Sequence, residues 1–414
     1  MDLQPQISKL RAIFLYSIVA FFLFFEMAIQ VSPSVMAPQL MHDLNIGTFG
    51  LGIMSGIYFY SYTAMQIPSG LLFDRYSPRI IITLSILVCA AGTLLFATAQ
   101  NMYVGSLARL LMGSGSAFAF VSVLVVTADL FKSTYFATIT GITQMLAALG
   151  AMSGQMPISA LVSVMGWRHT LLVLSLVGFL LAITVWTLLK YKKNSILIKH
   201  LEPSMSIKRH LHHIITNPQS WYVALYSCLL WAPMSCFASL WGVPYLTKIH
   251  HYEPTSAAFI CSFMWLGLAI TSPLLGIIST SCKNKIIPLA VSAILGALAF
   301  GFLLHYDFSP LIVCLLLFLA GAACSGQALA FTVVKENNPN SAKATAIAFN
   351  NMAVVLSGAI FQPLIGKLIE LAEVHGTSLY DIARFKEALG LVLFSYVIGF
   401  FIVIFFISEP VIDR

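Results

Sequence analysis

The sequence predicts an all-α membrane protein of twelve transmembrane helices in two sets of six. Of its 414 residues, 59% are hydrophobic and 9% are charged, against about 25% charged in a soluble domain. Apolar runs of about 20 residues recur along the whole chain, and each is long enough to cross a hydrocarbon core of about 30 Å as a helix. These two observations indicate that the solvent of this protein is the bilayer.

The first half of the chain carries six apolar runs separated by polar breaks. They are expected as helices near residues 12–36, 47–68, 80–99, 103–130, 136–163 and 168–190. Lys9 and Arg11 precede the first run, which is too long for the core of a signal peptide and lacks a convincing small-residue cleavage site. This run is therefore expected to remain as a membrane helix.

The second half repeats the arrangement. Six further helices are expected near residues 221–247, 256–278, 287–305, 309–333, 342–366 and 386–408. Between the halves lies a polar, basic stretch, so the chain is expected to divide into a first bundle (1–190), a cytoplasmic linker (191–219) and a second bundle (220–414). Anionic lipid attracts basic segments next to membrane helices, which suits a tether at the membrane surface.

The distribution of Lys and Arg predicts the orientation in the membrane. Sixteen of the 22 lie in the termini and in connectors on the side of the N-terminus, five lie on the opposite side, and Arg109 lies within a helix. Cytoplasmic connectors carry the excess of Lys and Arg in membrane proteins. We therefore expect a multi-pass protein of the inner (cytoplasmic) membrane with both termini in the cytoplasm.

Composition and spacing disfavour several other classes of protein. The net charge of +7 does not indicate nucleic-acid binding, because the basic residues are dispersed through short connectors. The seven cysteines lack CxxC spacing and are expected to be free, buried thiols. His210, His212 and His213 in the linker are expected to be solvated rather than to bind a metal. No cofactor or metal is expected, and no P-loop or H-E-x-x-H pattern indicates an ATP-driven pump or a membrane enzyme.

A loop between the second and third expected helices carries the clearest motif. Residues 70–79 read Gly-Leu-Leu-Phe-Asp-Arg-Tyr-Ser-Pro-Arg, which resembles the G-x-L-a-D-r-x-G-r-k signature of the major facilitator superfamily. The matching positions are Gly70, Leu72, Asp74, Arg75 and Arg79. Ser77 stands where the family has a second glycine, and Pro78 where it has a basic residue. The resemblance implies a fold of two six-helix bundles.

The chemistry of this loop suits a latch between helices. Gly70 permits a tight turn, Asp74 can face a helix N-terminus, and the arginines can pair with acids across the bundle. Asp129, at the cytoplasmic end of the fourth helix, is the expected partner of Arg75 or Arg79. The alternative is that these charges only set the orientation in the membrane.

The fourth expected helix carries Arg109-x-x-x-Gly113-x-Gly115, which looks like a second motif of the same family, R-x-x-x-G-x-G. An arginine at the centre of a membrane helix costs about 2.5–3.5 kcal/mol on insertion scales, so a partner or a water-filled cavity is expected. The resemblance implies a role in substrate binding or ion coupling. The family's antiporter pattern in the fifth helix is poorly matched by residues 141–157, which favours uptake or uniport over drug/proton antiport.

Three further stretches, at residues 31–36, 241–246 and 358–366, look like a bacterial branch similar to the lysosomal dipeptide uniporters and the nutrient permeases of intracellular pathogens. This resemblance implies amino acids, short peptides or metabolite anions as the transported solute.

Glu26 and Arg109 are the leading candidates for a functional site. Glu26 is the only acid deep in an expected membrane helix, and Gln30 lies one turn later on the same face. Glu26 could carry a proton, or it could stay ionised as the charge partner of Arg109. The planar guanidinium of Arg109 suits a carboxylate or phosphate of a substrate, and its alternative role is an internal salt bridge to Glu26.

Neutral polar side chains from both halves are expected around this pair, because amides in a bilayer must face protein or water. They are Tyr58, Tyr62, Gln144, Gln155, Trp231, Gln327, Asn350, Asn351 and Gln362. As a set they fit a cavity at the midplane between two bundles. Each of them could also serve only to join helices.

The sequence therefore predicts a secondary active or facilitative transporter of a small polar solute, working by alternating access with protons as a possible coupling ion. It is expected to be a monomer in the lipid bilayer. A drug or metabolite/proton exporter and a non-transporting membrane sensor are the alternatives, because fold alone does not determine function.

Overall fold

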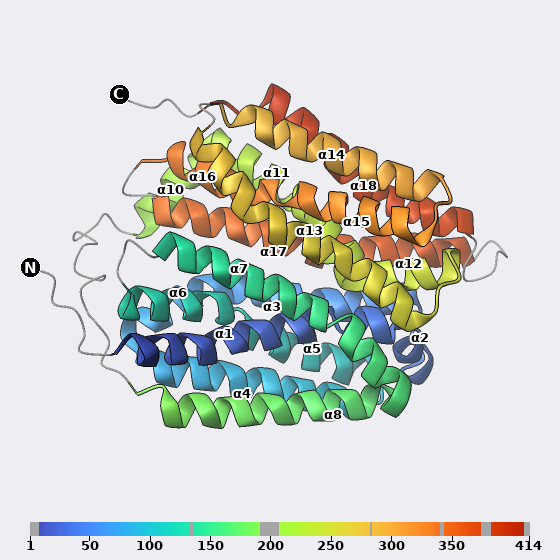
Figure 1. Cartoon of the computed structure of the whole chain (residues 1–414), viewed down its shortest axis with the longest axis horizontal. Helices are drawn as coiled ribbons and strands as arrows, with labels where there is room; N and C mark the ends of the chain where they lie inside the picture. Colours follow the sequence, from blue (N-terminus) through green and yellow to red (C-terminus); the bar gives the residue numbers. More distant parts are fainter. Residues whose placement is uncertain are drawn as a thin grey trace, which may run out of the picture.

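The computed structural model describes residues 8–131, 136–190, 207–281, 284–339, 343–373 and 382–409, and these residues form helices and connectors without a strand. Figure 1 shows the helices lying side by side, with both termini at one end of the molecule. We call this the termini end, and the opposite end, where α2 (Pro33–Asp43) and α12 (Gly242–Ile249) lie, the distal end. The predicted linker residues 191–206, Cys282 and the side chain of Asp74 lie outside the described part.

Two groups of helices follow one another along the chain and lie one above the other in Figure 1. The first consists of α1 (Lys9–Val31), α2, α3 (Thr48–Arg75), α4 (Pro78–Ala97), α5 (Met102–Ser116), α6 (Ala119–Leu130), α7 (Phe136–Ser153) and α8 (Met156–Leu188). The second consists of α10 (Ile207–Thr216), α11 (Pro218–Ala232), the π-helix η2 (Pro233–Trp241), α12, α13 (Pro254–Ser281), α14 (Ile286–His305), α15 (Pro310–Cys324), α16 (Gly326–Glu336), α17 (Lys343–Glu373) and α18 (Ile382–Phe405).

Ten helical segments of the described residues are long and apolar enough to cross a membrane. One of them, Ile142–Leu188, contains 47 residues and covers two of the expected spans, while α3 is not among the ten. Within it, α8 changes direction at Gly166, whose φ of 76° favours glycine. The all-helical membrane architecture is confirmed, whereas the count of twelve spans stays a prediction.

Five expected helices were wrong as continuous elements, because each is interrupted. The expected helix 12–36 divides between α1 and α2, 103–130 between α5 and α6, 136–163 between α7 and α8, 221–247 at η2, and 309–333 between α15 and α16. Four of these five are the first and fourth expected helices of each half. Interrupted helices at corresponding positions of two halves indicate a binding site between them.

The two groups meet along α3 with α17 and along α7 with α13. The contact is close because glycines line it: a Cβ on Gly52 would lie 2.6 Å from the carbonyl oxygen of Gln362. At the distal end, the Thr48 hydroxyl donates to the Gly366 carbonyl at 2.9 Å, and the Phe49 amide donates to Glu370 Oε2 at 3.2 Å. Backbone and side chains thus join the two groups at the distal end.

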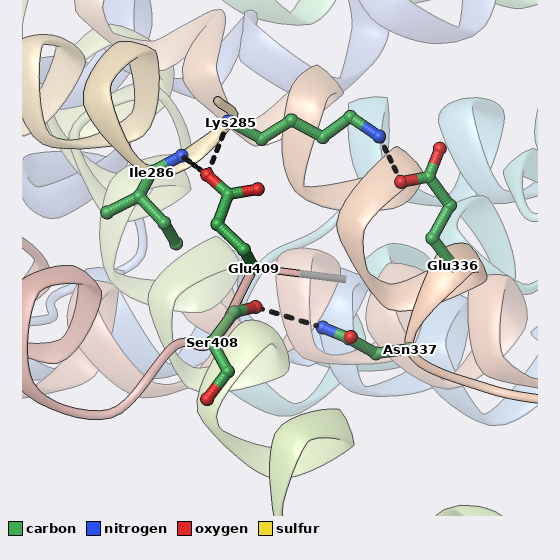
Figure 2. A network of polar contacts seen from close by, with 6 residues as sticks. All are labelled: Lys285, Ile286, Glu336, Asn337, Ser408 and Glu409. Carbon is green, nitrogen blue, oxygen red and sulfur yellow. Dashed lines mark hydrogen bonds and ion pairs between the residues drawn. The ribbon is translucent and has the colours of Figure 1, made fainter. Parts of the chain in front are cut away.

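A polar network ties helix ends of the second group together at the termini end (Figure 2). Glu409 Oε1 accepts hydrogen bonds from the backbone amides of Lys285 (2.7 Å) and Ile286 (3.0 Å), so a carboxylate caps the N-terminus of α14. Lys285 Nζ pairs with Glu336 at the end of α16. The end of the described chain is thereby attached to α14 and α16.

Candidate functional site

The break between α1 and α2 leaves backbone carbonyls in the interior of the first group. In a continuous helix the residue at position 33 would donate its N–H to the carbonyl of Ile29, but Pro33 has no N–H. Hydroxyls fill part of this gap, since Ser32 Oγ donates to the Ile29 carbonyl at 3.0 Å and Ser34 Oγ to the Val31 carbonyl at 2.8 Å. Carbonyls at a helix C-terminus also carry the negative end of the helix dipole.

Arg109, which lies on α5, binds carbonyls that this break leaves free. Its Nη1 donates to the Ile29 carbonyl and its Nη2 to the Gln30 carbonyl, both at 3.3 Å, and its side chain is only 1% exposed. The cation is therefore held by the dipole of α1 rather than by a carboxylate. No ion pair among the described residues includes Arg109, and its Nε has no hydrogen-bond partner there.

Tyr58 of α3 lies between the arginine and the acid. The Arg109 guanidinium stacks over the Tyr58 ring at 4.4 Å, and the Tyr58 hydroxyl donates to Glu26 Oε1 at 2.8 Å. Glu26 is 1% exposed, and its second oxygen has no partner among the described residues. The anticipated alternative of a direct salt bridge between Glu26 and Arg109 is absent from the described contacts. A fixed cation and an ionisable acid are instead joined through one phenol.

A stripe of polar residues continues from this cluster along α3. Tyr62 lies one turn beyond Tyr58, with ring centroids 6.2 Å apart, and Gln66 follows one turn later on α3. Gln66 Oε1 accepts from Asn351 Nδ2 of α17 at 3.1 Å, which joins the two groups. Sequence reasoning missed Gln66. Its position, four residues after Tyr62 and eight after Tyr58, could have indicated that it belongs to the site, because residues at these spacings lie on one face of a helix.

The other predicted site residues lie in different places. Gln155 and Gln362 donate to backbone carbonyls of η2. Asn350 of α17 is fully buried, and neither atom of its amide has a partner among the described residues. Hydrogen bonds of the described residues do not join the remaining three to the Glu26 cluster: exposed Gln144 (α7), half-buried Trp231 (α11) and buried Gln327 (α16).

The latch expected at residues 70–79 was wrong as a loop, because Gly70, Asp74 and Arg75 belong to the last turns of α3 at the termini end and only Tyr76 and Ser77 separate α3 from α4. Gly70 therefore makes no tight turn. Gly70 and Arg75 are exposed. Arg79 Nε donates to the Trp186 carbonyl of α8 at 2.6 Å, and its guanidinium stacks over the Trp186 ring at 4.1 Å. Asp129 is buried near the end of α6. The pairing of Asp129 with Arg75 or Arg79 stays a prediction.

Gly113, four residues after Arg109, sets how closely α5 approaches α3. A Cβ at this position would collide with the Tyr58 carbonyl. We expect Gly113→Ala to lower the free energy of unfolding by about 1–3 kcal/mol, the usual cost of overpacking, and to lower the melting temperature in detergent. Gly390→Ala is the matched control, because a Cβ there meets nothing within 4 Å. Equal melting temperatures for the two variants would contradict the assigned packing role.

Comparisons with known proteins agree with this architecture. A sequence model of the Major Facilitator Superfamily matches residues 16–363. The uncharacterized transporter YybO of Bacillus subtilis is 24% identical over 398 residues, which cover 89% of this chain and 90% of the relative. The probable sulfoacetate transporter SauU of Cupriavidus necator is 27% identical over 160 residues, or 39% of this chain and 36% of the relative.

Solved structures show the same fold. A bacterial homologue of the human lysosomal transporter Spinster, in an inward-facing and unoccupied conformation, aligns with a TM-score of 0.79 at 15% identity and covers 96% of this chain and 97% of its own. A D323A mutant of the nucleoside transporter NupG aligns with a TM-score of 0.78 at 13% identity, covering 94% and 99%. At these identities the likeness concerns the fold.

Proposed function

This chain belongs to the Major Facilitator Superfamily and is a membrane transporter rather than an enzyme; from this premise we propose that it carries a small polar solute with an anionic group, coupled to a proton, by alternating access. Amino acids, short peptides and organic anions all carry such a group. The partial likeness to a probable sulfoacetate transporter supports an organic anion in particular.

The observation that carries the proposal is the Arg109–Tyr58–Glu26 cluster. Arg109 keeps its charge in an apolar bundle without a carboxylate within 4 Å among the described residues. Its hydrogen bonds go to backbone carbonyls, which do not neutralise it. An anionic group of the solute is the missing counter-charge, and a guanidinium binds such groups through two parallel hydrogen bonds.

Glu26 is the group that would bind and release the coupled proton. A proton on Glu26 would leave the cluster with a net charge of +1, which favours binding of an anion. Loss of that proton would make the cluster neutral and favour release. Tyr58 contacts both charged groups, so the state of Glu26 can affect Arg109 through one side chain.

The excess of Lys and Arg in the connectors at the termini end supports a cytoplasmic location of that end. In uptake, the solute would therefore enter from the distal side. In this scheme, the two bundles rock about the site, and the contacts of α3 with α17 and α7 with α13 separate at the distal end.

Uptake into liposomes tests the proposal. Purified protein would be reconstituted and supplied with radiolabelled amino acids, dipeptides and small organic anions including sulfoacetate, with and without a proton gradient directed toward the termini side. We expect one anionic solute to accumulate only with the gradient. Binding of a solute without uptake would favour a sensor, and gradient-driven extrusion would favour an antiporter.

A further inference from the structure

The segment η2 breaks the regular bonding of the second group's first long helix. The Gly242 N–H donates to the carbonyl of Phe237, five residues earlier, instead of Ala238, four residues earlier. The Ala238 carbonyl is therefore released from its α-helical partner in the interior of the protein. Every residue of η2 is buried, so water does not reach this carbonyl from the surface.

The side-chain amide of Gln155, which belongs to the first group of helices, binds this carbonyl. Its Nε2 donates to the Ala238 oxygen at 2.6 Å and to Cys261 Sγ of α13 at 3.3 Å. Gln155 stands at the break between α7 and α8, where its backbone (φ −100°, ψ −88°) leaves the helix, and its side chain is fully buried. This amide is thus aimed across the interface between the two groups.

A second amide shows how η2 is held from its own side. The side-chain amide of Gln362 on α17 donates to the Ser235 carbonyl at 2.6 Å, and the backbone carbonyl of Gln362 accepts from Trp241 Nε1 at 3.2 Å. Both of these bonds stay within the second group. Of the two amides that hold η2, Gln155 alone comes from the first group, so separation of the groups at the distal end must break its bond.

We propose that Gln155 is a positioning residue for transport, because its amide binds the carbonyl that the π-helix releases and so holds the distal end closed. Breaking this bond costs about one hydrogen bond, because the Gly242 N–H can bind the Ala238 carbonyl only by leaving the buried Phe237 carbonyl. The inference rests on the alternating-access part of the proposed function, and it is independent of the solute, the proton and Glu26.

Cys261 provides the test, because its thiol is fully buried beside Gln155. A form of the whole chain that retains Cys261 as its only cysteine would be treated with a membrane-impermeant maleimide, from the distal side and, in oppositely oriented vesicles, from the termini side. Gln155→Met keeps the length of the side chain and removes the donor. We expect it to raise the labelling rate from the distal side about fivefold, which corresponds to one lost hydrogen bond.

Two further variants, and labelling from both sides of the membrane, complete the test. Gln39→Met, an exposed glutamine of α2 at the same end, should label at the parent rate. Gln155→Asn shortens the amide by one methylene and should label at an intermediate rate, which keeps a readout if Gln155→Met does not fold.

Unchanged labelling of Cys261 in Gln155→Met, or in Gln155→Asn where only that variant folds, would overturn the proposal. A labelling rate that rises equally from both sides would also overturn it, since that indicates local loosening around Cys261. Failure of the uptake assay, in contrast, leaves this labelling result unaffected.

Discussion

Glu26→Gln is expected to abolish gradient-driven accumulation of the solute, reducing it to the level of protein-free liposomes. The glutamine carbonyl can still accept the hydrogen bond from the Tyr58 hydroxyl, which now reaches Glu26 Oε1 at 2.8 Å. The side chain can no longer bind and release a proton, so a proton gradient has no group to act on at this site. Downhill exchange of labelled for unlabelled solute should persist. The measurement is uptake with and without an imposed pH gradient, compared with exchange in the same liposomes.

Glu387→Gln is the matched control for this prediction. Glu387 is exposed on α18 and pairs with Arg384 at 3.0 Å, far along the chain from the cluster. Its replacement should leave accumulation unchanged. If Glu26→Gln accumulates solute as the parent does, Glu26 is not the proton carrier, and its role is confined to joining α1 and α3.

Arg109→Gln is expected to eliminate uptake and also to destabilise the protein. The variant removes the cation from the Ile29 and Gln30 carbonyls and leaves the Ile29 carbonyl only the Ser32 hydroxyl as a side-chain donor. Loss of hydrogen bonds from a charged donor costs about 1.5–3 kcal/mol. It also removes the only positive charge that could bind an anionic solute in this cluster. Arg109→Lys keeps the charge as a single point without the planar fork, so solute affinity should fall even where the protein folds. Uptake and melting temperature would be measured on the same preparations.

Arg168 offers a control with the same contacts in another place. Its Nη1 donates to the carbonyls of Ala97 (3.2 Å) and Ala99 (2.7 Å), and its guanidinium stacks over Trp167 at 4.1 Å. Arg168→Gln should lower the melting temperature and leave solute affinity unchanged. A parallel loss of affinity in both arginine variants would show that Arg109 acts through stability alone.

Much of the candidate site was predictable because charge at membrane depth is costly. Glu26 and Arg109 stood out in the sequence for that reason, and Tyr58 was among the neutral groups expected near them. The manner of their meeting was not predictable. The open alternative of a direct salt bridge assumed that opposite charges in lipid must touch, whereas Tyr58 lies between them and the backbone of α1 binds the cation.

The interrupted helices also include features that the sequence indicates and features that it does not. Pro33 marks the break between α1 and α2 in the sequence, because a missing N–H always frees a carbonyl. The π-helical segment also begins at a proline, Pro233, but the sequence does not indicate that the π-helix extends to Trp241, since its bonding depends on amides from other helices. Gln66 was missed in a similar way. Its partner Asn351 lies 285 residues later in the chain, and only the packing of α3 on α17 brings them together.

By itself, the sequence determined that this protein lies in a membrane as apolar helices, and which acid and which cation are buried in it. The reason is that transfer into lipid depends on the composition of each run of about 20 residues, which is a local property. Tertiary structure alone decided that Arg109 binds the broken end of α1 and that Gln155 binds η2 across the interface. These contacts depend on the rotation and interruption of helices that pack together from distant parts of the chain, and no local pattern encodes that geometry.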